Sequence, residues 1–294
     1  MYQADPPRSP IETLLMPYST GYSVPQTDPP RSPRETLPTM YDLPSEYPEE
    51  PGLPDEFHDL QPQLLSRTLS LANYSREEWF TASDLNVYYD VHHPLWHKRP
   101  DWFLSVGVPR LYDGRDLRRS YVVWQEGQPP TVVVEFLSPR TERDDLGRFY
   151  EDADRIEEAS GAEAESLLKT PSKLEVYERY LKVAHYFVYS RYTQRLRYFK
   201  LVGSQYEEQR LNPEQPMIWM EDLQVGLGVW RGCFEGIEAC WLRWCDRAGN
   251  WLLTDTEQAQ ARLVQEQAKA DLEQQRAERL ANRLRELGVD PDQV

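Results

Sequence analysis

Apolar residues in this chain gather in short runs bounded by prolines, glycines and charged loops, which is the pattern of buried β-strands. Three such runs, Trp102–Val108, Ser120–Gln125 and Thr131–Leu137, predict successive strands of one antiparallel meander. The links between them are short enough to form hairpins. Further apolar runs at His185–Ser190 and Gln194–Val202 predict another pair of strands. We therefore expect a central sheet.

Apolar residues at helical spacing mark three segments around these strands. Leucines recur at helical intervals in Glu56–Ala72, and Lys173–Val183 carries apolar residues at i, i+3 and i+7. Thr254–Leu287 predicts one long helix that ends at Gly288. Shorter patterns add strands at Asp84–Tyr89 and Leu223–Trp230 and a hairpin at Trp241–Trp251 that turns at Asp246–Asn250. This order of elements predicts an α+β fold, a mixed central sheet flanked by helices.

Composition divides the chain into a tail, a globular domain and a terminal helix. Residues 1–55 hold more than half of the 24 prolines and a near repeat of Asp5–Tyr18 at Asp28–Tyr41, so they predict a disordered, acidic tail. Residues 56–253 hold most of the aromatic residues and predict one domain. Residues 254–288 predict a C-terminal helix whose apolar residues recur at intervals of seven. This spacing predicts a coiled-coil homodimer with an interrupted seam.

The net charge of −16 argues against loose affinity for nucleic acid, because phosphate contacts need lysine and arginine. It does not exclude a nuclease, whose acids are partly neutralised by bound metal. We expect neither a membrane span nor an export signal, since no apolar run approaches the length of a spanning helix. The three cysteines, Cys233, Cys240 and Cys245, predict reduced, buried thiols in a cytoplasmic protein.

One carboxylate, Glu135, ends the most apolar of these runs, TVVVEFLSP. Burying an unpaired carboxylate is costly, so this glutamate indicates either a functional site or a structural ion pair. A second acid, Asp101, follows Pro100 and opens an earlier strand, and Lys173 begins a helix downstream. Two acids at strand ends and a nearby lysine are the residues that a metal-dependent phosphodiester nuclease needs.

The order of these motifs resembles the Uma-two family, which is abundant in cyanobacteria. The likeness rests on Pro100-Asp101, Val134–Pro139 (VEFLSP), Lys173 with Tyr177, and Val183–Val188 (VAHYFV). It covers roughly residues 57–254. Members are restriction-endonuclease-like proteins of the PD-(D/E)XK nuclease superfamily. The resemblance implies a restriction-endonuclease-like core of the α+β (α/β) class and a magnesium-dependent endonuclease that acts on DNA.

The same resemblance implies a role for each site residue. Asp101 and Glu135 would hold Mg²⁺, or Mn²⁺ in its place, and the backbone carbonyl of Phe136 would complete the ligand set. Lys173 would orient or deprotonate the attacking water and offset charge in the transition state. The lysine that the superfamily usually carries two residues after the glutamate is replaced here by Leu137. We therefore expect Lys173 to be the relocated lysine, in the first turn of its helix and at the surface.

Other basic and aromatic residues compete with these assignments. Arg148 is a basic residue nearer to Glu135 in the sequence than Lys173, but an arginine cannot act as a base. Tyr177 is expected to pack in the core. The acidic run at residues 142–165 predicts an exposed loop or helix.

The histidines give weaker signals. His58 lies at the start of a predicted helix, where a structural role is the simpler interpretation. His92, His93 and His97 lie within six residues of one another, but nothing in the sequence fixes the geometry that zinc would need. Two functions therefore stay open: an active DNA endonuclease, and a catalytically inactive nuclease fold that serves as an interaction or scaffold module through its C-terminal helix.

Overall fold

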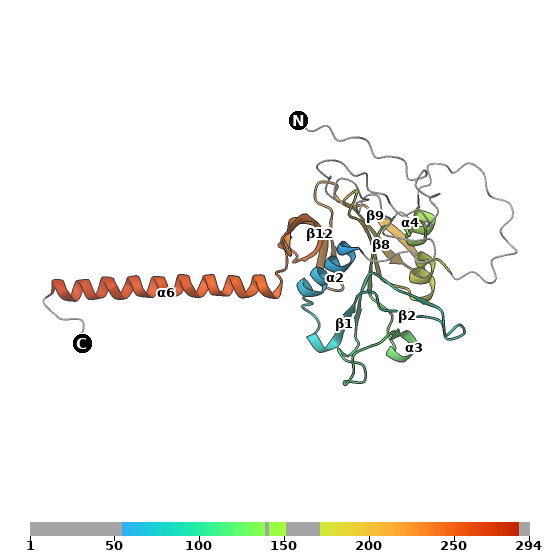
Figure 1. Cartoon of the computed structure of the whole chain (residues 1–294), viewed down its shortest axis with the longest axis horizontal. Coiled ribbons are helices and arrows are strands. Elements are labelled where there is room, and N and C mark those ends of the chain that lie inside the picture. Colours follow the sequence, from blue (N-terminus) through green and yellow to red (C-terminus); the bar gives the residue numbers. More distant parts are fainter. Residues whose placement is uncertain (1–54, 139–140, 151–170, 288–294) are drawn as a thin grey trace, which may run out of the picture. The chain divides into compact units, whose positions relative to one another are not determined.

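A computed structural model describes residues 55–138, 141–150 and 171–287 of the chain (Figure 1). The predicted N-terminal tail, the predicted helix end at Gly288 and most of the acidic run lie outside the described residues. The fold is α+β, as the sequence predicts, with mixed sheets and flanking helices.

Six strands form the central sheet, in the order β1-β4-β6-β7-β8-β9. Their bounds are β1 Trp79–Ala82, β4 Trp102–Val106, β6 Val132–Phe136, β7 His185–Ser190, β8 Arg195–Val202 and β9 Gln205–Gln209. β6 and β7 run parallel, and the other neighbouring pairs are antiparallel. Both β6 and β7 are buried along their whole length, which explains their continuous apolar sequence.

The predicted meander is wrong at its middle strand. Ser120–Gln125 forms only the two-residue strand β5 (Tyr121–Val122), which the short helix α3 (Val123–Glu126) follows. β5 belongs to a separate small sheet with β2 (Val87–Tyr88) and β3 (His97–Lys98). Its apolar character arises because Tyr121 packs on Phe80 and Phe103 of the central sheet. β4 and β6 are therefore direct neighbours.

One face of the central sheet packs against helix α2 (Glu56–Thr68) and a second antiparallel sheet. That sheet contains β10 (Met217–Met220), β11 (Val225–Phe234) and β12 (Ile237–Cys245). The side chain of Gln61 on α2 donates to the carbonyl of Leu242 at 2.9 Å and accepts from its N–H at 2.7 Å. This buried exchange fixes α2 on β12, where the two elements lie side by side in Figure 1.

The other face is covered by short helical segments on both sides of the undescribed part of the acidic run. They are α4 (Glu142–Leu146), η2 (Gly147–Phe149), α5 (Lys173–Glu175) and η3 (Val176–Tyr180). The predicted helix at Lys173–Val183 begins at a capping box, in which Ser172 accepts from the Glu175 N–H at 3.2 Å. It then widens into a π-helical turn, η3, closed by the Leu181 N–H on the carbonyl of Val176. π-helical turns often occur at functional sites.

The hairpin predicted at Trp241–Trp251 is shifted in the structure. β11 and β12 form the hairpin, and they turn at Glu235 and Gly236, both with positive φ. Asp246–Asn250 does turn as predicted, but only a single bridge joins Cys245 to Trp251. Cys233 near the turn of this hairpin is exposed, Cys240 is half-buried and Cys245 is buried, so the prediction of buried thiols is wrong for Cys233.

Helix α6 (Asp255–Glu286) matches the long helix that the sequence predicts. Thr254 caps it, and salt bridges from Arg67 to Asp255 and from Arg243 to Glu257 hold its first turn. None of its residues is buried. Among the helices that the structure describes, none is both long and apolar enough to cross a membrane.

Candidate active site

Asp101 and Glu135 come together across the β4–β6 pair. Trp102 pairs with Val134, so continuing the antiparallel register by one residue places Asp101 opposite Glu135. Directly opposed side chains lie on one face of the sheet, with Cβ atoms about 5 Å apart. Asp101 Oδ2 also accepts the Phe136 N–H at 2.5 Å, which fixes its carboxylate at the end of the sheet. The two predicted acids therefore occupy one end of neighbouring strands.

Glu135 is fully buried, and both of its oxygens have partners. Tyr177 donates its hydroxyl to Oε1 at 2.5 Å, and Lys173 donates to Oε2 at 2.8 Å. Burial raises the pKa of Glu135 to about 7, against the opposing charge of Lys173 and with a further contribution from Asp101. Tyr177 packs in the core as predicted, and its hydroxyl also orients the glutamate.

Lys173 reaches the site from the first turn of α5. Its Nζ lies 2.8 Å from Glu135 Oε2 and 3.0 Å from Asp145 Oδ1. Only 16% of its side chain is exposed, so the expectation of a surface lysine is wrong. Burial works against its charge, but Asp145 and Glu135 outweigh burial and hold the pKa of Lys173 well above its ordinary value. The side chain is therefore an ammonium at neutral pH.

Asp145 is the site residue that the sequence did not reveal. It lies in α4, inside the acidic run that predicts an exposed loop, yet its side chain is fully buried. Burial raises the pKa of Asp145 to about 7 in spite of Lys173. Gly147 permits this burial: it has φ +49°, and a Cβ there would lie 2.7 Å from Leu174. In the sequence, the apolar Leu146 and the glycine Gly147 directly after Asp145 are the local signs of a buried turn.

His58 lies beside the carboxylates, at the start of α2. Its Nδ1 is 2.8 Å from Asp55 Oδ1, and its Nε2 is 3.4 Å from the carbonyl oxygen of Phe136. Burial disfavours the charged ring, but the hydrogen bond to Asp55 and the charge of Asp101 outweigh it and raise the pKa of His58. The histidine that the sequence assigns to structure thus borders the site.

Arg148, the rival of Lys173, is engaged elsewhere. Its guanidinium donates to both oxygens of Glu178, at 2.9 and 2.6 Å, and to the carbonyl of Tyr206 at 3.2 Å. These contacts use the planar guanidinium to join η2, η3 and β9. Arg148 therefore has no contact with Glu135 among the interactions of the described residues.

The residues fit a hard divalent cation. Three carboxylates, from Asp101, Glu135 and Asp145, share one lysine, so the cluster has more acid than base. Asp145 Oδ1 faces the Lys173 ammonium at 3.0 Å, and its buried Oδ2 has no hydrogen-bond partner among the described residues. Within the described ranges no three or more His, Cys, Asp or Glu side chains form a ready metal cage, and His92, His93 and His97 are no exception. The candidate donors are thus the carboxylates of Asp101 and Glu135 and the carbonyl of Phe136. Mg²⁺ often binds to so few protein ligands, with water in its remaining coordination positions.

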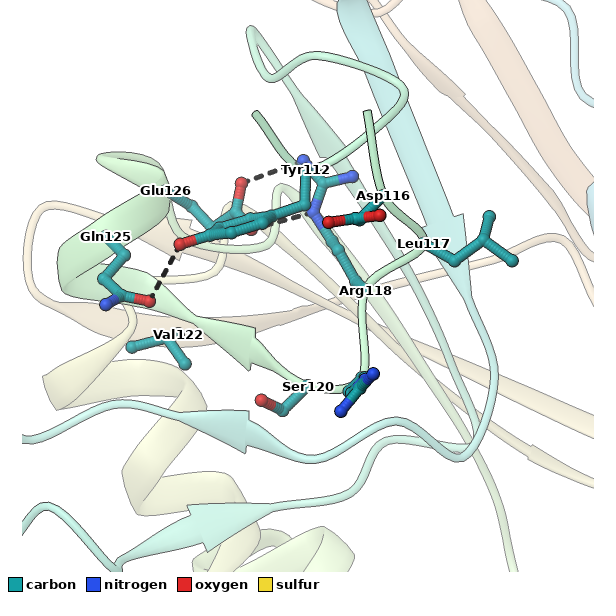
Figure 2. Close-up of a pocket in the computed structure, with 9 residues that line it drawn as sticks. Tyr112, Asp116, Leu117, Arg118, Ser120, Val122, Gln125 and Glu126 are labelled. Atoms are coloured by element: carbon teal, nitrogen blue, oxygen red, sulfur yellow. Dashed lines mark hydrogen bonds and ion pairs between the residues drawn. The ribbon is translucent and has the colours of Figure 1, made fainter. Parts of the chain in front are cut away.

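A separate pocket of about 630 Å³ lies near β5 and α3, away from the carboxylates (Figure 2). Arg118 lines it but pairs with Glu126, Nε to Oε1 at 2.8 Å and Nη2 to Oε2 at 2.9 Å, and also donates to the carbonyls of Arg110 and Pro109. Tyr112 faces Gln125 across the opening. Arg118 and Glu126 are thus engaged in holding the loop of the pocket itself.

The comparison with known families follows the same residues. Residues 33–230, which include Asp101, Glu135 and Lys173, match the family Uma2, described as "Putative restriction endonuclease". No curated protein matched the chain. The family match covers more than half of the 294 residues and includes the whole carboxylate cluster. The chain therefore belongs to the Uma2 family of restriction-endonuclease-like proteins.

Proposed function

We propose that the protein is a metal-dependent endonuclease that hydrolyses phosphodiester bonds in DNA. Membership of a family described as restriction endonucleases supports nuclease activity. The observation that carries the proposal is the fully buried Glu135 beside Asp101, with the Lys173 ammonium 2.8 Å away. A buried acid with a raised pKa beside a second acid and a lysine is the arrangement found at functional sites.

Mg²⁺, or Mn²⁺ in its place, is the proposed cofactor. Asp101, Glu135 and the carbonyl of Phe136 would hold it, since hard cations prefer oxygen ligands. When bound, the ion would lower the pKa of a coordinated water molecule and would stabilise the negative charge on the phosphate. The carbonyl of Phe136 can serve because its contact with His58 is long, at 3.4 Å.

The chain's own residues position the reacting groups. Lys173 acts as a charged donor, since its raised pKa keeps it protonated at neutral pH. It orients water and offsets charge on the phosphate in the transition state. Tyr177 holds one oxygen of Glu135 and leaves the other to face Lys173. His58 lies beside these groups, and the hydrogen bond to Asp55 and the charge of Asp101 raise its pKa against the effect of burial.

Cleavage of supercoiled plasmid DNA in Mg²⁺ tests the proposal, with the wild type and Glu135→Gln compared. Glu178→Gln is the matched control, because Glu178 is also buried but pairs with Arg148 away from the site. We expect Glu135→Gln to lose at least about a hundredfold in rate, as expected for a lost ligand of a catalytic metal. Glu178→Gln should stay within about threefold, provided that circular dichroism shows it folded. A wild type that cuts in neither Mg²⁺ nor Mn²⁺ would refute the proposal.

The second function left open by the sequence is an inactive scaffold, and helix α6 favours it. This helix has 32 residues, none buried, and Leu263 and Leu280 in it and Leu287 at its C-cap are each more than 60% exposed. A helix with this much exposed apolar surface suits a partner helix, and a homodimer is the simplest partner. An inactive wild type that sediments as a dimer, and becomes a monomer when α6 is removed, would support this function instead.

A further inference from the structure

The ammonium of Lys173 occupies the oxygen that a metal ion would need. Its Nζ bridges Glu135 Oε2 at 2.8 Å and Asp145 Oδ1 at 3.0 Å, while Tyr177 holds Glu135 Oε1 at 2.5 Å. A divalent cation on Glu135 and an ammonium on the same oxygen repel each other strongly in a buried site. Metal binding at Glu135 therefore requires the ammonium to move off that oxygen.

Asp145 is placed to keep the ammonium when this happens. Its carboxylate is fully buried, with Oδ1 3.0 Å from Lys173 and Oδ2 without a hydrogen-bond partner among the described residues, so the ion pair with Lys173 is its main electrostatic support. It lies inside α4 and caps no helix, so its carboxylate is left to pair with the lysine. Its neighbour Asp144 is 44% exposed and lies 3.6 Å from Lys98, which is the ordinary situation of an acid in this run.

The backbone holds Asp145 in this position from two sides. Tyr186 on β7 donates its hydroxyl to the Asp145 carbonyl at 2.8 Å. On the other side, Gly147 lies against Leu174: a Cβ there would be 2.7 Å from Leu174 Cδ2 and 3.1 Å from its Cβ, and the φ of +49° disfavours other residues. These contacts set the Asp145 carboxylate against the lysine without using the carboxylate itself.

We propose that Asp145 is a positioning residue that retains the ammonium of Lys173 in the site when a divalent cation replaces that ammonium at Glu135. The inference rests on the proposed function, because it concerns the same metal site. Asp145 then favours metal binding without touching the metal, since it weakens the hold of Lys173 on Glu135. It also keeps the lysine within reach of the scissile phosphate.

A double-mutant cycle on Mn²⁺ binding, measured by calorimetry without DNA, tests this role. The four proteins are the wild type, Asp145→Asn, Lys173→Met and the double variant, each checked for folding by circular dichroism. Asp145→Asn should weaken Mn²⁺ binding about tenfold, because Lys173 then rests on Glu135 alone. With Lys173→Met in place, Asp145→Asn should cost no more than about threefold, since the competing ammonium is gone. Lys173→Gln serves in the cycle if Lys173→Met does not fold.

The control is Asp144→Asn, which removes the same charge one residue away and should leave Mn²⁺ affinity unchanged within twofold. A loss near tenfold that persists without the lysine would show Asp145 to be a metal ligand and would overturn the inference. Asp145→Asn that binds Mn²⁺ like the wild type would also overturn it. In both cases the proposed function stands. A wild type that binds no Mn²⁺ would refute the proposed function, and the inference with it.

Discussion

Two buried glutamates on the same side of the central sheet, Glu135 and Glu178, have pKa values shifted in opposite directions. Both are at most 2% exposed. Burial alone would raise the pKa of Glu178, but the hydrogen bonds from Arg148 and from the Tyr206 N–H bring it below its ordinary value. Burial raises the pKa of Glu135 to about 7, and the Lys173 charge does not reverse it. Equal burial thus leaves the pKa of Glu178 below its ordinary value and the pKa of Glu135 above it.

The difference lies in the ratio of acids to bases. Glu178 has a bidentate arginine and a backbone donor of its own. Glu135 shares a single lysine with Asp145 and lies opposite Asp101. A balanced pair is what a fold needs, whereas surplus negative charge in a buried site is what a cation-binding site needs. Under the proposed function, the contrast separates a structural glutamate from a metal-binding one within one domain.

The largest expected effect separates the two basic residues. Lys173→Met should lower the rate of metal-dependent plasmid cleavage at least about a hundredfold, because it removes charge that offsets the transition state. Arg148→Met should leave the rate within about threefold, because its guanidinium is bound to Glu178 and Tyr206. Initial cleavage rates of the two folded variants decide the matter. Full activity in Lys173→Met would remove the lysine from the mechanism.

The second prediction concerns the contribution of the Arg148–Glu178 ion pair to stability. Arg148→Met should lower the free energy of unfolding by about 2 kcal/mol, because it leaves the Glu178 carboxylate buried without its cation. The value is below that of fully buried pairs because 44% of the Arg148 side chain is exposed. Urea unfolding of the metal-free protein measures the change. An unchanged midpoint would show that the Tyr206 N–H alone suffices for Glu178.

A smaller effect depends on pH. In the metal-free fold the pKa of Glu135 is about 7, against an ordinary value of 4.5. The native state therefore keeps a proton that the unfolded chain has lost, so its contribution to stability is full below pH 4.5 and disappears as the pH rises through 7. The raised pKa of Lys173 changes the stability only above pH 10.5, the ordinary pKa of a lysine, and so does not affect this pH range.

Glu135→Gln should consequently match the wild type near pH 5 and exceed its stability by about 1–2 kcal/mol near pH 8. Urea unfolding at the two pH values, with a chelator present, gives the difference. Glu178→Gln is the control: its pKa is lowered, so its loss of stability should be similar at both pH values. A difference for Glu135→Gln that does not change with pH would contradict the assigned pKa.

The smallest expected effect concerns helix α6. Its contacts with the domain lie in its first turn, through Asp255 and Glu257, and none of its residues is buried. A chain that ends after residue 262 should therefore unfold within about 0.5 kcal/mol of the full chain, as for surface changes. Dilute protein avoids any contribution from self-association. A larger loss at low concentration would mean that the helix packs on the domain.

Much of this comparison could be anticipated from the sequence. Strands β6 and β7 are buried on both faces, so their apolar runs identify them, and the acid inside VVVEF stands out against that background. The position of Lys173 was predictable only through the family pattern, since the undescribed part of the acidic run separates it from Glu135. The burial of Lys173 between two acids could not be predicted, because a lysine in the first turn of a helix is ordinarily solvated.

The sequence does not reveal which residues of distant segments pack against each other. Asp145 has the same local composition as Asp144, and contacts with distant residues, Lys173 and Tyr186, accompany the burial of Asp145 alone. In the same way, the YVVW run predicts a central strand, but Tyr121 packs above the sheet and leaves β4 beside β6. Both outcomes depend on packing between elements, which local periodicity does not encode.

The most direct test of the metal site is anomalous diffraction from crystals soaked in Mn²⁺. We predict one strong peak at the end of β4 and β6, within about 2.6 Å of carboxylate oxygens of both Asp101 and Glu135, as for hard-cation ligands. The Lys173 ammonium should then lie nearer to Asp145 than to Glu135. No peak at saturating Mn²⁺, or a peak only at His92, His93 and His97, would contradict the account.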